Sequence, residues 1–169
     1  MDAQALLRDL QAWGRELGFA HIGVSDLDLS RAEAGLARWL AAGFQGSMDY
    51  MARHGTRRTR PAELVPGTLS VISLRLNYLP EDTAPLERLA DGEAAYISRY
   101  ALGRDYHKMM RKRLQKLAGR IAEAIGPFGY RVFVDSAPLL EKALARNAGL
   151  GWVGKNTLIL NRKAGSFFF

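Results

Sequence analysis

Apolar side chains recur along the chain at two spacings, one typical of helices and the other of strands. Leu6, Leu10 and Trp13 stand three or four residues apart and are followed by Gly18. This predicts an amphipathic helix that ends at the glycine. Residues 19–24 form a short apolar run, which predicts a strand. We therefore expect the chain to begin with a helix that leads directly into a sheet.

A second helix and a second strand follow in the pattern. Ser30 and Glu33 have the spacing of a capping box, which predicts a helix that starts there. Residues 48–60 read as a short helix or turn rich in arginine, and residues 69–78 are rich in β-formers and predict the clearest strand of the chain. The polar residues 79–93 predict a surface loop.

The second half of the chain continues the alternation. Residues 94–100 predict another core strand. Asp105 can cap the longest helix, 106–125, whose inward side would include Ile125. Residues 130–134 predict a further strand. Strands that alternate with helices indicate an α/β or α+β domain with a sheet flanked by helices, and 169 residues suit one domain.

The C-terminal residues predict a hairpin that is not finished. Residues 157–160 and 166–169 have strand-like composition and are joined by a turn, and the chain stops at three consecutive phenylalanines. Three aromatic residues on an unfinished sheet edge would invite aggregation. We therefore interpret residues 1–169 as one domain of a longer protein.

Positive charge is concentrated in one segment. Residues 99–120 contain eight lysines and arginines and one acidic residue, whereas the other 16 basic residues are balanced by 16 acidic ones. The formal net charge of +7 therefore belongs to this segment, and localised charge of this kind attracts a polyanion. Residues 53–60 form a second basic cluster. Both clusters could be solvated faces, but together they would repel unless an anion such as tRNA or a phosphate-bearing cofactor lay between them.

The composition excludes several kinds of site. The chain has no cysteine, so within these residues there is no disulfide, thiolate nucleophile or cysteine-ligated metal centre. Its three histidines are far apart, and no metal ligated by this chain is expected. No apolar run reaches the ~18 residues of a membrane span. The N-terminus lacks the pattern of a secretory signal, so the default expectation is a cytoplasmic protein without a membrane partner.

The glycine-rich segment 149–156 satisfies two nucleotide-binding patterns, GxGxxG and GxxxxGK. Both patterns require a strand before the glycines and a helix after them, whereas here a predicted helix comes first and a strand second. Asn156 also replaces the Ser or Thr that would hold magnesium. The segment is therefore expected to be a tight turn, or a turn whose glycines let the backbone approach a bulky ligand.

Asp135 follows the predicted strand 130–134 and precedes a predicted helix that starts near Pro138 and ends at Gly149. One interpretation is that Asp135 or Ser136 caps this helix. The other is that Asp135 is a general acid at the mouth of a cleft, because α/β sheets place ligands beyond the carboxyl ends of their strands. The residues alone leave both interpretations open.

Six motifs, in order along the chain, resemble the N-terminal half of the epoxyqueuosine reductases, a family of tRNA-modifying enzymes. They are MARHG (51–55), RRTRPAELVPG (57–67), SRYALGRDYHK (98–108), VDSAP (134–138), AGLGWVGKN (148–156) and GSFFF (165–169). The resemblance implies cobalamin-dependent reduction of epoxyqueuosine to queuosine at the wobble position of tRNA, the last step of queuosine biosynthesis. It also implies a nitroreductase-like fold that is truncated here before a ferredoxin-like domain with two 4Fe–4S clusters. The partners would be a tRNA anticodon stem-loop and an external electron donor, and the isolated fragment is expected to be inactive.

The resemblance also assigns roles to residues. Asp135 matches the family's proposed proton donor to the epoxide oxygen. Cobalamin contacts are implied for Arg58, Ser98, Asp135, Asn156, Thr157 and Ile159. Contacts to the anticodon stem are expected from Arg104, Lys108, Arg111 and Lys112. Lys142 stands where the family's motif has arginine, and because the two side chains are not equivalent in bidentate anion contacts, any substrate role at this position is in doubt.

Two other functions remain open on the residues alone. One is a non-catalytic RNA-binding domain that uses the two basic clusters, and the other is a flavin-dependent reductase of nitroreductase type. Retention of red cobalamin through gel filtration would distinguish the reductase from the RNA-binding domain, whereas a yellow preparation would favour flavin.

Overall fold

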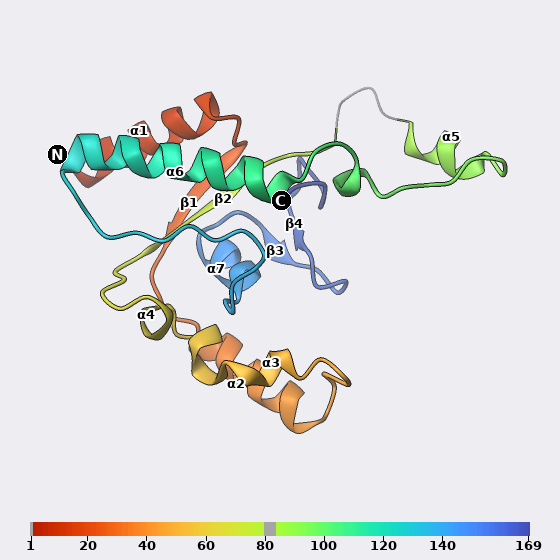
Figure 1. Cartoon of the computed structure of the whole chain (residues 1–169), viewed down its shortest axis with the longest axis horizontal. Helices are drawn as coiled ribbons and strands as arrows, with labels where there is room; N and C mark the ends of the chain where they lie inside the picture. Colours follow the sequence, from red (N-terminus) through yellow and green to blue (C-terminus); the bar gives the residue numbers. More distant parts are fainter. Residues whose placement is uncertain (1, 80–83) are drawn as a thin grey trace.

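The computed structural model describes residues 2–79 and 84–169 and shows a mixed α/β architecture (Figure 1). The first part comprises α1 (Ala3–Glu16), β1 (His21–Ser25), α2 (Ser30–Ala41), α3 (Tyr50–Arg53), the 3-10 turn η1 (Gly55–Arg58), α4 (Pro61–Leu64) and β2 (Val71–Arg75). The second part comprises α5 (Pro85–Ala90), the 3-10 turn η2 (Arg99–Ala101), α6 (Tyr106–Ile125), α7 (Glu141–Asn147), β3 (Trp152–Val153) and β4 (Ile159–Leu160). Among the described residues, no helix is both long and apolar enough to cross a bilayer.

The antiparallel pair β1–β2 lies at the centre, and α1 and α6 lie side by side against one face of it (Figure 1). Successive strand residues point to opposite faces. Ile22 of β1 faces the helices and packs with Leu10 of α1 and Leu117 of α6 in a buried cluster. These contacts confirm the strands predicted at 19–24 and 69–78, and they fix α6 relative to the sheet.

The opposite face of the same sheet is covered by α7, which approaches closely enough to require a glycine. A Cβ atom at Gly23 of β1 would collide with the carbonyl oxygen of Ala148, the C-terminal cap of α7. The antiparallel hairpin β3–β4 contacts α7. The chain then returns to the sheet, where Phe169 and Leu76 exchange backbone hydrogen bonds of 2.9 and 3.0 Å. Residues 166–169 form no named strand, so the predicted strand is present only as these backbone hydrogen bonds.

The longest helix, α6, begins and ends where the sequence predicts. Asp105 is its N-cap, and an Asp105 carboxylate oxygen accepts a hydrogen bond of 3.0 Å from the backbone N–H of His107. Met110, Leu117 and Ile121 are buried, but Ile125 is 49% exposed. The predicted inward position of Ile125 is therefore wrong, because the last turn of α6 extends past the sheet residues that bury the earlier turns.

Two predicted strands are absent from the described structure. Residues 94–100 are mostly exposed and contain no strand, and they belong to an arm that also carries α5 (Figure 1). Residues 130–134 form no strand and pair with no described strand. A β-strand needs a neighbour to bond its N–H and C=O groups, and neither segment has one. The loop predicted at 79–93 contains α5, and its residues 80–83 lie outside the described structure.

The start of α2 also differs from the prediction. Ser30 is the first residue of the helix rather than its cap, and its backbone N–H is accepted by Asp28 Oδ1 at 2.9 Å. Glu33 does not turn back to the helix end but binds Arg60 and Thr59. The capping box is therefore wrong, because a guanidinium from the next segment competes successfully for the Glu33 carboxylate.

Candidate functional site

Asp135 lies on a turn of unusual backbone geometry. Its φ of 56° is in the left-handed region, which L-residues other than Asn and Asp rarely adopt. Helix α7 starts later, at Glu141, and its N-cap is Leu140. The predicted start near Pro138 is therefore wrong, and so is the interpretation of Asp135 or Ser136 as a helix cap. The Asp135 side chain is consequently not used to close a helix end.

The carboxylate of Asp135 is held by two residues from the first turn of α6. The hydroxyl of Tyr106 donates a short hydrogen bond to Asp135 Oδ2. His107 Nε2 lies 3.6 Å from the same oxygen, and its other ring nitrogen, Nδ1, lies 2.9 Å from Asp105 Oδ1. The side chain of Asp135 remains 56% exposed. The site therefore presents an oriented carboxylate that a substrate can reach.

The surroundings shift the pKa values of three neighbours. Burial raises the pKa of Tyr106, and its hydrogen bond to Asp135 raises the pKa further, so this hydroxyl stays protonated and acts as a donor. Hydrogen bonds from the His107 side chain and backbone lower the pKa of Asp105. Burial raises the pKa of Glu141 to about 7, and the nearby charge of Asp135 adds to the effect. Within the described residues, Oε1 of Glu141 is buried and has no hydrogen-bond partner.

An aromatic surface adjoins the Asp135 turn. Tyr106 stacks on Phe169 with ring centroids 3.8 Å apart, and Tyr78 packs against Phe169 at 4.8 Å and Phe167 at 6.1 Å. Phe167 is still 39% exposed. These rings come from the residues after β2, from the start of α6 and from the C-terminal segment. They form an apolar surface of mutually inclined rings next to a polar group.

Arg58, a predicted cofactor contact, is 7% exposed. Its guanidinium donates to the backbone oxygens of Met51 (2.9 Å) and Tyr50 (2.6 Å). The backbone oxygen of Arg58 accepts a 3.0 Å hydrogen bond from the N–H of Leu140. Arg58 thus ties η1 to the segment that follows Asp135, with its side chain occupied by backbone acceptors.

The predicted cofactor contacts Asn156, Thr157 and Ile159 lie together on the β3–β4 hairpin. Asn156 Oδ1 accepts a hydrogen bond of 3.2 Å from the N–H of Leu158, and Thr157 has a φ of 65°. Ile159 is buried. Three large apolar side chains of the same hairpin are exposed: Trp152, Val153 and Leu158. The hairpin therefore carries an uncovered apolar surface beside its polar tip.

The glycines of this hairpin are explained by packing within the chain. A Cβ atom at Gly151 would collide with the backbone oxygen of Leu160, and one at Gly154 would lie 2.7 Å from the Leu160 side chain. Strand β3, which the sequence did not predict, occupies the middle of the glycine-rich segment. The glycines at 151 and 154 therefore let the backbone of this segment approach β4 rather than a ligand.

Ser98 is not brought to the Asp135 turn by any contact among the described residues. It is exposed and precedes η2 on the arm. Tyr100, in the same turn, lies near enough to Tyr106 for its charge to contribute to the raised pKa of the Tyr106 hydroxyl. The arm thereby borders the site, although Ser98 itself faces solvent.

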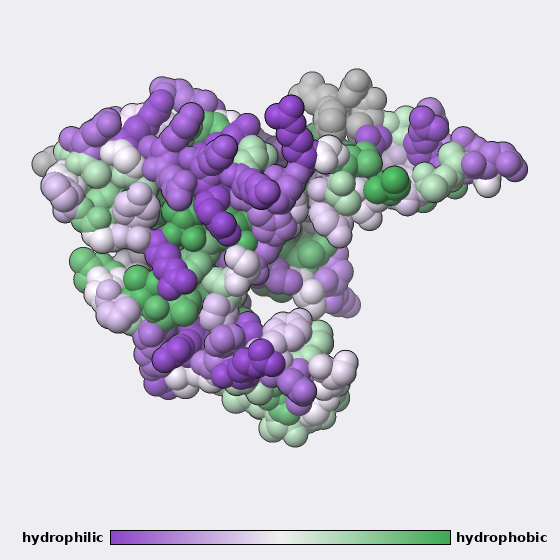
Figure 2. Space-filling view, viewed as in Figure 1, coloured by the Kyte–Doolittle hydropathy of each residue, from purple (hydrophilic) through white to green (hydrophobic). Residues whose placement is uncertain are grey.

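A basic groove runs along α6 beside the end of α1. Hydrophilic residues gather over this layer of the molecule (Figure 2). The groove has a volume of about 790 Å³, and its cationic lining is Arg104, Lys108, Lys112, Arg113 and Lys116. The structure thus brings together three of the four predicted RNA contacts, whereas Arg111 is exposed but does not line the groove.

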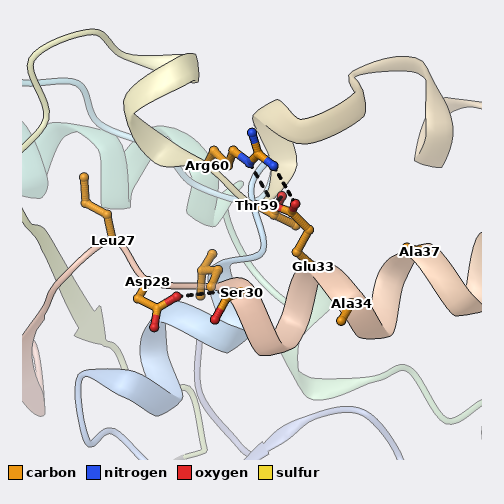
Figure 3. A pocket seen from close by; sticks show the side chains of 9 residues that line it. Leu27, Asp28, Ser30, Glu33, Ala34, Ala37, Thr59 and Arg60 are labelled. Atoms are coloured by element: carbon orange, nitrogen blue, oxygen red, sulfur yellow. Dashed lines mark hydrogen bonds and ion pairs between the residues drawn. The ribbon is translucent and has the colours of Figure 1, made fainter.

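A second hollow, of about 410 Å³, lies between α2 and the segment that leads into α4 (Figure 3). Arg60 reaches across it to Glu33 at 2.8 Å and also binds Glu63 at 3.1 Å. The hydrogen bonds from Arg60 and Thr59 lower the pKa of Glu33 to about 2. None of the predicted site residues lines this hollow, so its polar groups serve to hold α2 against α4.

Sequence reasoning missed three neighbours of Asp135. Tyr106 and His107 stand in the motif at 98–108, and the Asp105 cap placed them in the first helical turn, but nothing in the sequence showed that this turn meets residue 135. Glu141 gave no signal, because its burial depends on where α7 begins.

Comparison with known proteins finds relatives that match the chain along its whole length. A family profile described as "Epoxyqueuosine reductase QueG, DUF1730" matches residues 58–136, which include β2, the whole of α6 and the Asp135 turn. The epoxyqueuosine reductase of Pseudomonas aeruginosa is 66% identical over 168 residues, which are 99% of this chain and 46% of that protein. That of Vibrio cholerae is 56% identical over 169 residues, with 100% and 46% covered.

The fold is also shared with a solved structure. A crystal structure of an epoxyqueuosine reductase with an epoxyqueuosine-modified tRNA-Tyr stem loop matches with a TM-score of 0.80 at 21% identity, and the match covers 99% of this chain and 44% of the other. The chain spans about half the length of the curated relatives it matches. The sequence relationship thus extends along the whole chain and the fold agrees, so the chain is similar to a part of the epoxyqueuosine reductases that makes up about half of their length.

Proposed function

We propose that this chain is the cobalamin-binding half of an enzyme that reduces epoxyqueuosine to queuosine at the wobble position of tRNA. The observation that carries the proposal is the exposed carboxylate of Asp135, held on a left-handed turn by Tyr106 and His107. Because relatives of this name are about twice as long, we assign the reaction to a polypeptide of their length. The other half would supply a ferredoxin-like domain with two 4Fe–4S clusters next to a nitroreductase-like sheet domain.

Asp135 serves as the general acid in this proposal. When a carbon–oxygen bond of an epoxide breaks, negative charge develops on the oxygen, and a carboxylic acid within hydrogen-bond reach lowers the barrier by donating a proton. Tyr106 stays protonated because burial raises its pKa, so it orients the carboxyl group without competing for the proton. The exposure of Asp135 leaves room for the substrate to approach.

Cobalamin is the cofactor that we propose, and the exposed apolar groups of this chain suit a large, partly apolar ring. The β3–β4 hairpin exposes Trp152, Val153 and Leu158 with no apolar cover among the described residues, and Phe167 of the aromatic surface is 39% exposed. Apolar surface of this extent is expected to be covered by a ligand or by protein. The residues proposed to hold the ring are Arg58, Ser98, Asp135, Asn156, Thr157 and Ile159. When bound, cobalamin would supply a reducible metal centre for transfer of electrons to the substrate.

The tRNA partner is proposed from the groove along α6. Its cations could each pair with a phosphate, and phosphate contacts provide most of the affinity and orientation in such complexes. The structural relative bound to a modified tRNA stem loop supports the same class of partner. A tRNA substrate also makes the cytoplasm the proposed location, and an external donor would supply the electrons.

The direct test uses the full-length enzyme that contains this chain. The protein is mixed with cobalamin, passed through gel filtration, and then incubated with a chemical reductant and an epoxyqueuosine-modified stem loop. We expect a red protein fraction and conversion of epoxyqueuosine to queuosine by mass spectrometry. RNA binding without cobalamin retention or conversion would contradict the proposal and favour a non-catalytic RNA-binding domain, whereas a yellow fraction active with flavin would favour a flavin reductase.

A further inference from the structure

Removal of an epoxide oxygen requires two protons as well as two electrons. Both carbon–oxygen bonds break, a carbon–carbon double bond forms, and the oxygen leaves as water. Asp135 carries one proton at a time, so a second proton has to reach it from elsewhere before turnover is complete. This requirement rests on the proposed function, in which a low-potential external reductant supplies the electrons.

His107 is placed to meet this requirement. Its Nε2 lies 3.6 Å from Asp135 Oδ2, and its Nδ1 lies 2.9 Å from Asp105 Oδ1. The imidazole thus stands between two carboxylates, and stacking on Tyr106 at a centroid distance of 4.0 Å limits its rotation. Its side chain is 40% exposed, so it can exchange protons with water.

We propose that His107 relays protons from solvent to Asp135. After Asp135 has donated its first proton to the opened epoxide oxygen, the protonated imidazole gives its Nε2 proton to Asp135 Oδ2, and Asp135 donates this second proton to form water. His107 then takes two protons from solvent in turn, passes the first to Asp135 and keeps the second, so both groups return to their starting states. Asp105 supports the relay because its carboxylate lies 2.9 Å from Nδ1 and fixes the orientation of the ring. The 3.6 Å separation must shorten or be bridged by one water for transfer, as is common in catalytic sites before substrate binds.

The groups around the relay favour His107 over its neighbours. Tyr106 is a poor proton source because burial and its bond to Asp135 raise its pKa. Glu141 is near Asp135 and its pKa is raised to about 7, but its Oε1 is buried, so exchange with solvent is hindered. The other charged or titratable groups close to these residues are Tyr100 of η2 and Lys108 of α6.

The test measures single-turnover conversion of the modified stem loop by full-length His107→Gln and His107→Ala. We expect the rate to fall by about 10²-fold, a typical loss for one proton-transfer group, while the affinity for the stem loop and the bound cobalamin stay unchanged. In His107→Ala, added imidazole should restore much of the rate, with a pH dependence that follows protonation of the added base. His21→Gln, a substitution at the start of β1, is the matched control and should keep the wild-type rate.

A merely structural role for His107 predicts a different result. In that case imidazole would not rescue His107→Ala and His107→Gln would change the rate and stem-loop affinity together, which would overturn the relay. Wild-type rates in both His107 variants would overturn it as well. The wild-type enzyme and Asp135→Asn, each with the same imidazole, correct for other effects of the added base.

A second readout does not depend on turnover. The ¹⁵N resonances of the His107 ring in the enzyme without substrate should respond separately to the two carboxylates. Asp135→Asn is expected to shift mainly the Nε2 resonance and Asp105→Asn mainly the Nδ1 resonance. If the ring resonances do not change in Asp135→Asn, the inference is contradicted even if the enzyme is active. A wild-type enzyme that does not convert the stem loop while this coupling is present would count against the proposed function alone.

Discussion

At the residue scale, the site combines groups whose environments pull their protonation in opposite directions. Asp105 accepts hydrogen bonds that lower its pKa, whereas the enclosed carboxyl of Glu141 has its pKa raised to about 7. Opposite pKa shifts among the groups around one site are characteristic of active sites. These pKa shifts depend on where α6 and α7 begin. The start of α6 places Asp105 where groups of His107 donate to it, and the start of α7 places Glu141 in a buried position.

Glu141 provides a pH-dependent test of this contrast. Its pKa is about 7 in the folded chain and about 4.3 when unfolded. Between these values the folded state holds a proton that the unfolded state has lost, so stability falls as pH rises through this window. Glu141→Gln should therefore be more stable than wild type by about 2–3 kcal/mol at pH 8 and by much less at pH 5. Thermal unfolding across this range checks the prediction, and a difference independent of pH would contradict it.

The sequence permitted a choice of two roles for Asp135 but did not decide between them. A helix cap and a general acid would have the same sequence context, after an apolar segment and before a helix. Only the observed start of α7 at Glu141 distinguishes the two roles. The partners Tyr106 and His107 come from 29 and 28 positions earlier along the chain, and one of these contacts is a side-chain hydrogen bond from the first turn of α6 to the Asp135 turn. Sequence periodicity carries no information about contacts of this kind.

At the element scale, the longest periodic segment predicted its helix well, whereas apolar runs predicted two strands correctly, at 19–24 and 69–78, and two wrongly, at 94–100 and 130–134. The prediction of α6 succeeded because its apolar stripe is long and Asp105 provides a cap. Residues 94–100 and 130–134 have the composition of strands, but strand formation depends on a partner elsewhere in the chain. Strand β3 was read as part of a turn because the glycines of segment 149–156 obscured it, whereas β4 falls within the predicted strand 157–160.

The packing of α7 on the sheet can be tested at Gly23. Gly23→Ala should destabilise the protein by about 1–3 kcal/mol, because the added methyl group meets a backbone oxygen that cannot move without shifting α7. Gly35→Ala in α2 is the matched control, since no atom lies within 4 Å of the added Cβ. The control should be neutral or stabilising by about 0.5–1 kcal/mol. Equal unfolding temperatures for Gly23→Ala and wild type would contradict the proposed approach of α7.

At the scale of the whole molecule, the sheet separates two surfaces with different chemistry. The α1–α6 layer carries the basic groove, and the opposite side carries α7 and the hairpin with its exposed apolar residues (Figures 1 and 2). The excess positive charge was visible in the sequence, and so was the mixed α/β class. The sequence did not show which cations share a groove, because that depends on how α1 lies beside α6.

The groove predicts how RNA binding responds to salt. Each lysine that neutralises a phosphate contributes about 0.7–0.9 to the slope of log affinity against log salt concentration. Lys108→Ala and Lys112→Ala in the full-length enzyme should each reduce this slope by nearly one, whereas Arg38→Ala on the exposed side of α2 should leave it unchanged. Fluorescence anisotropy with a labelled stem loop at several salt concentrations measures the slope. Equal slopes for all variants would exclude the groove as the RNA contact.

The central claim is that Asp135 delivers the proton to the epoxide oxygen, and the most direct measurement is a single-turnover assay of full-length Asp135→Asn. Bound cobalamin is quantified by absorbance in the same sample, and the nucleoside product is identified by mass spectrometry. The account predicts a cobalamin content and stem-loop affinity like those of wild type, with formation of queuosine abolished. Queuosine formed by this variant at the wild-type rate would contradict the account.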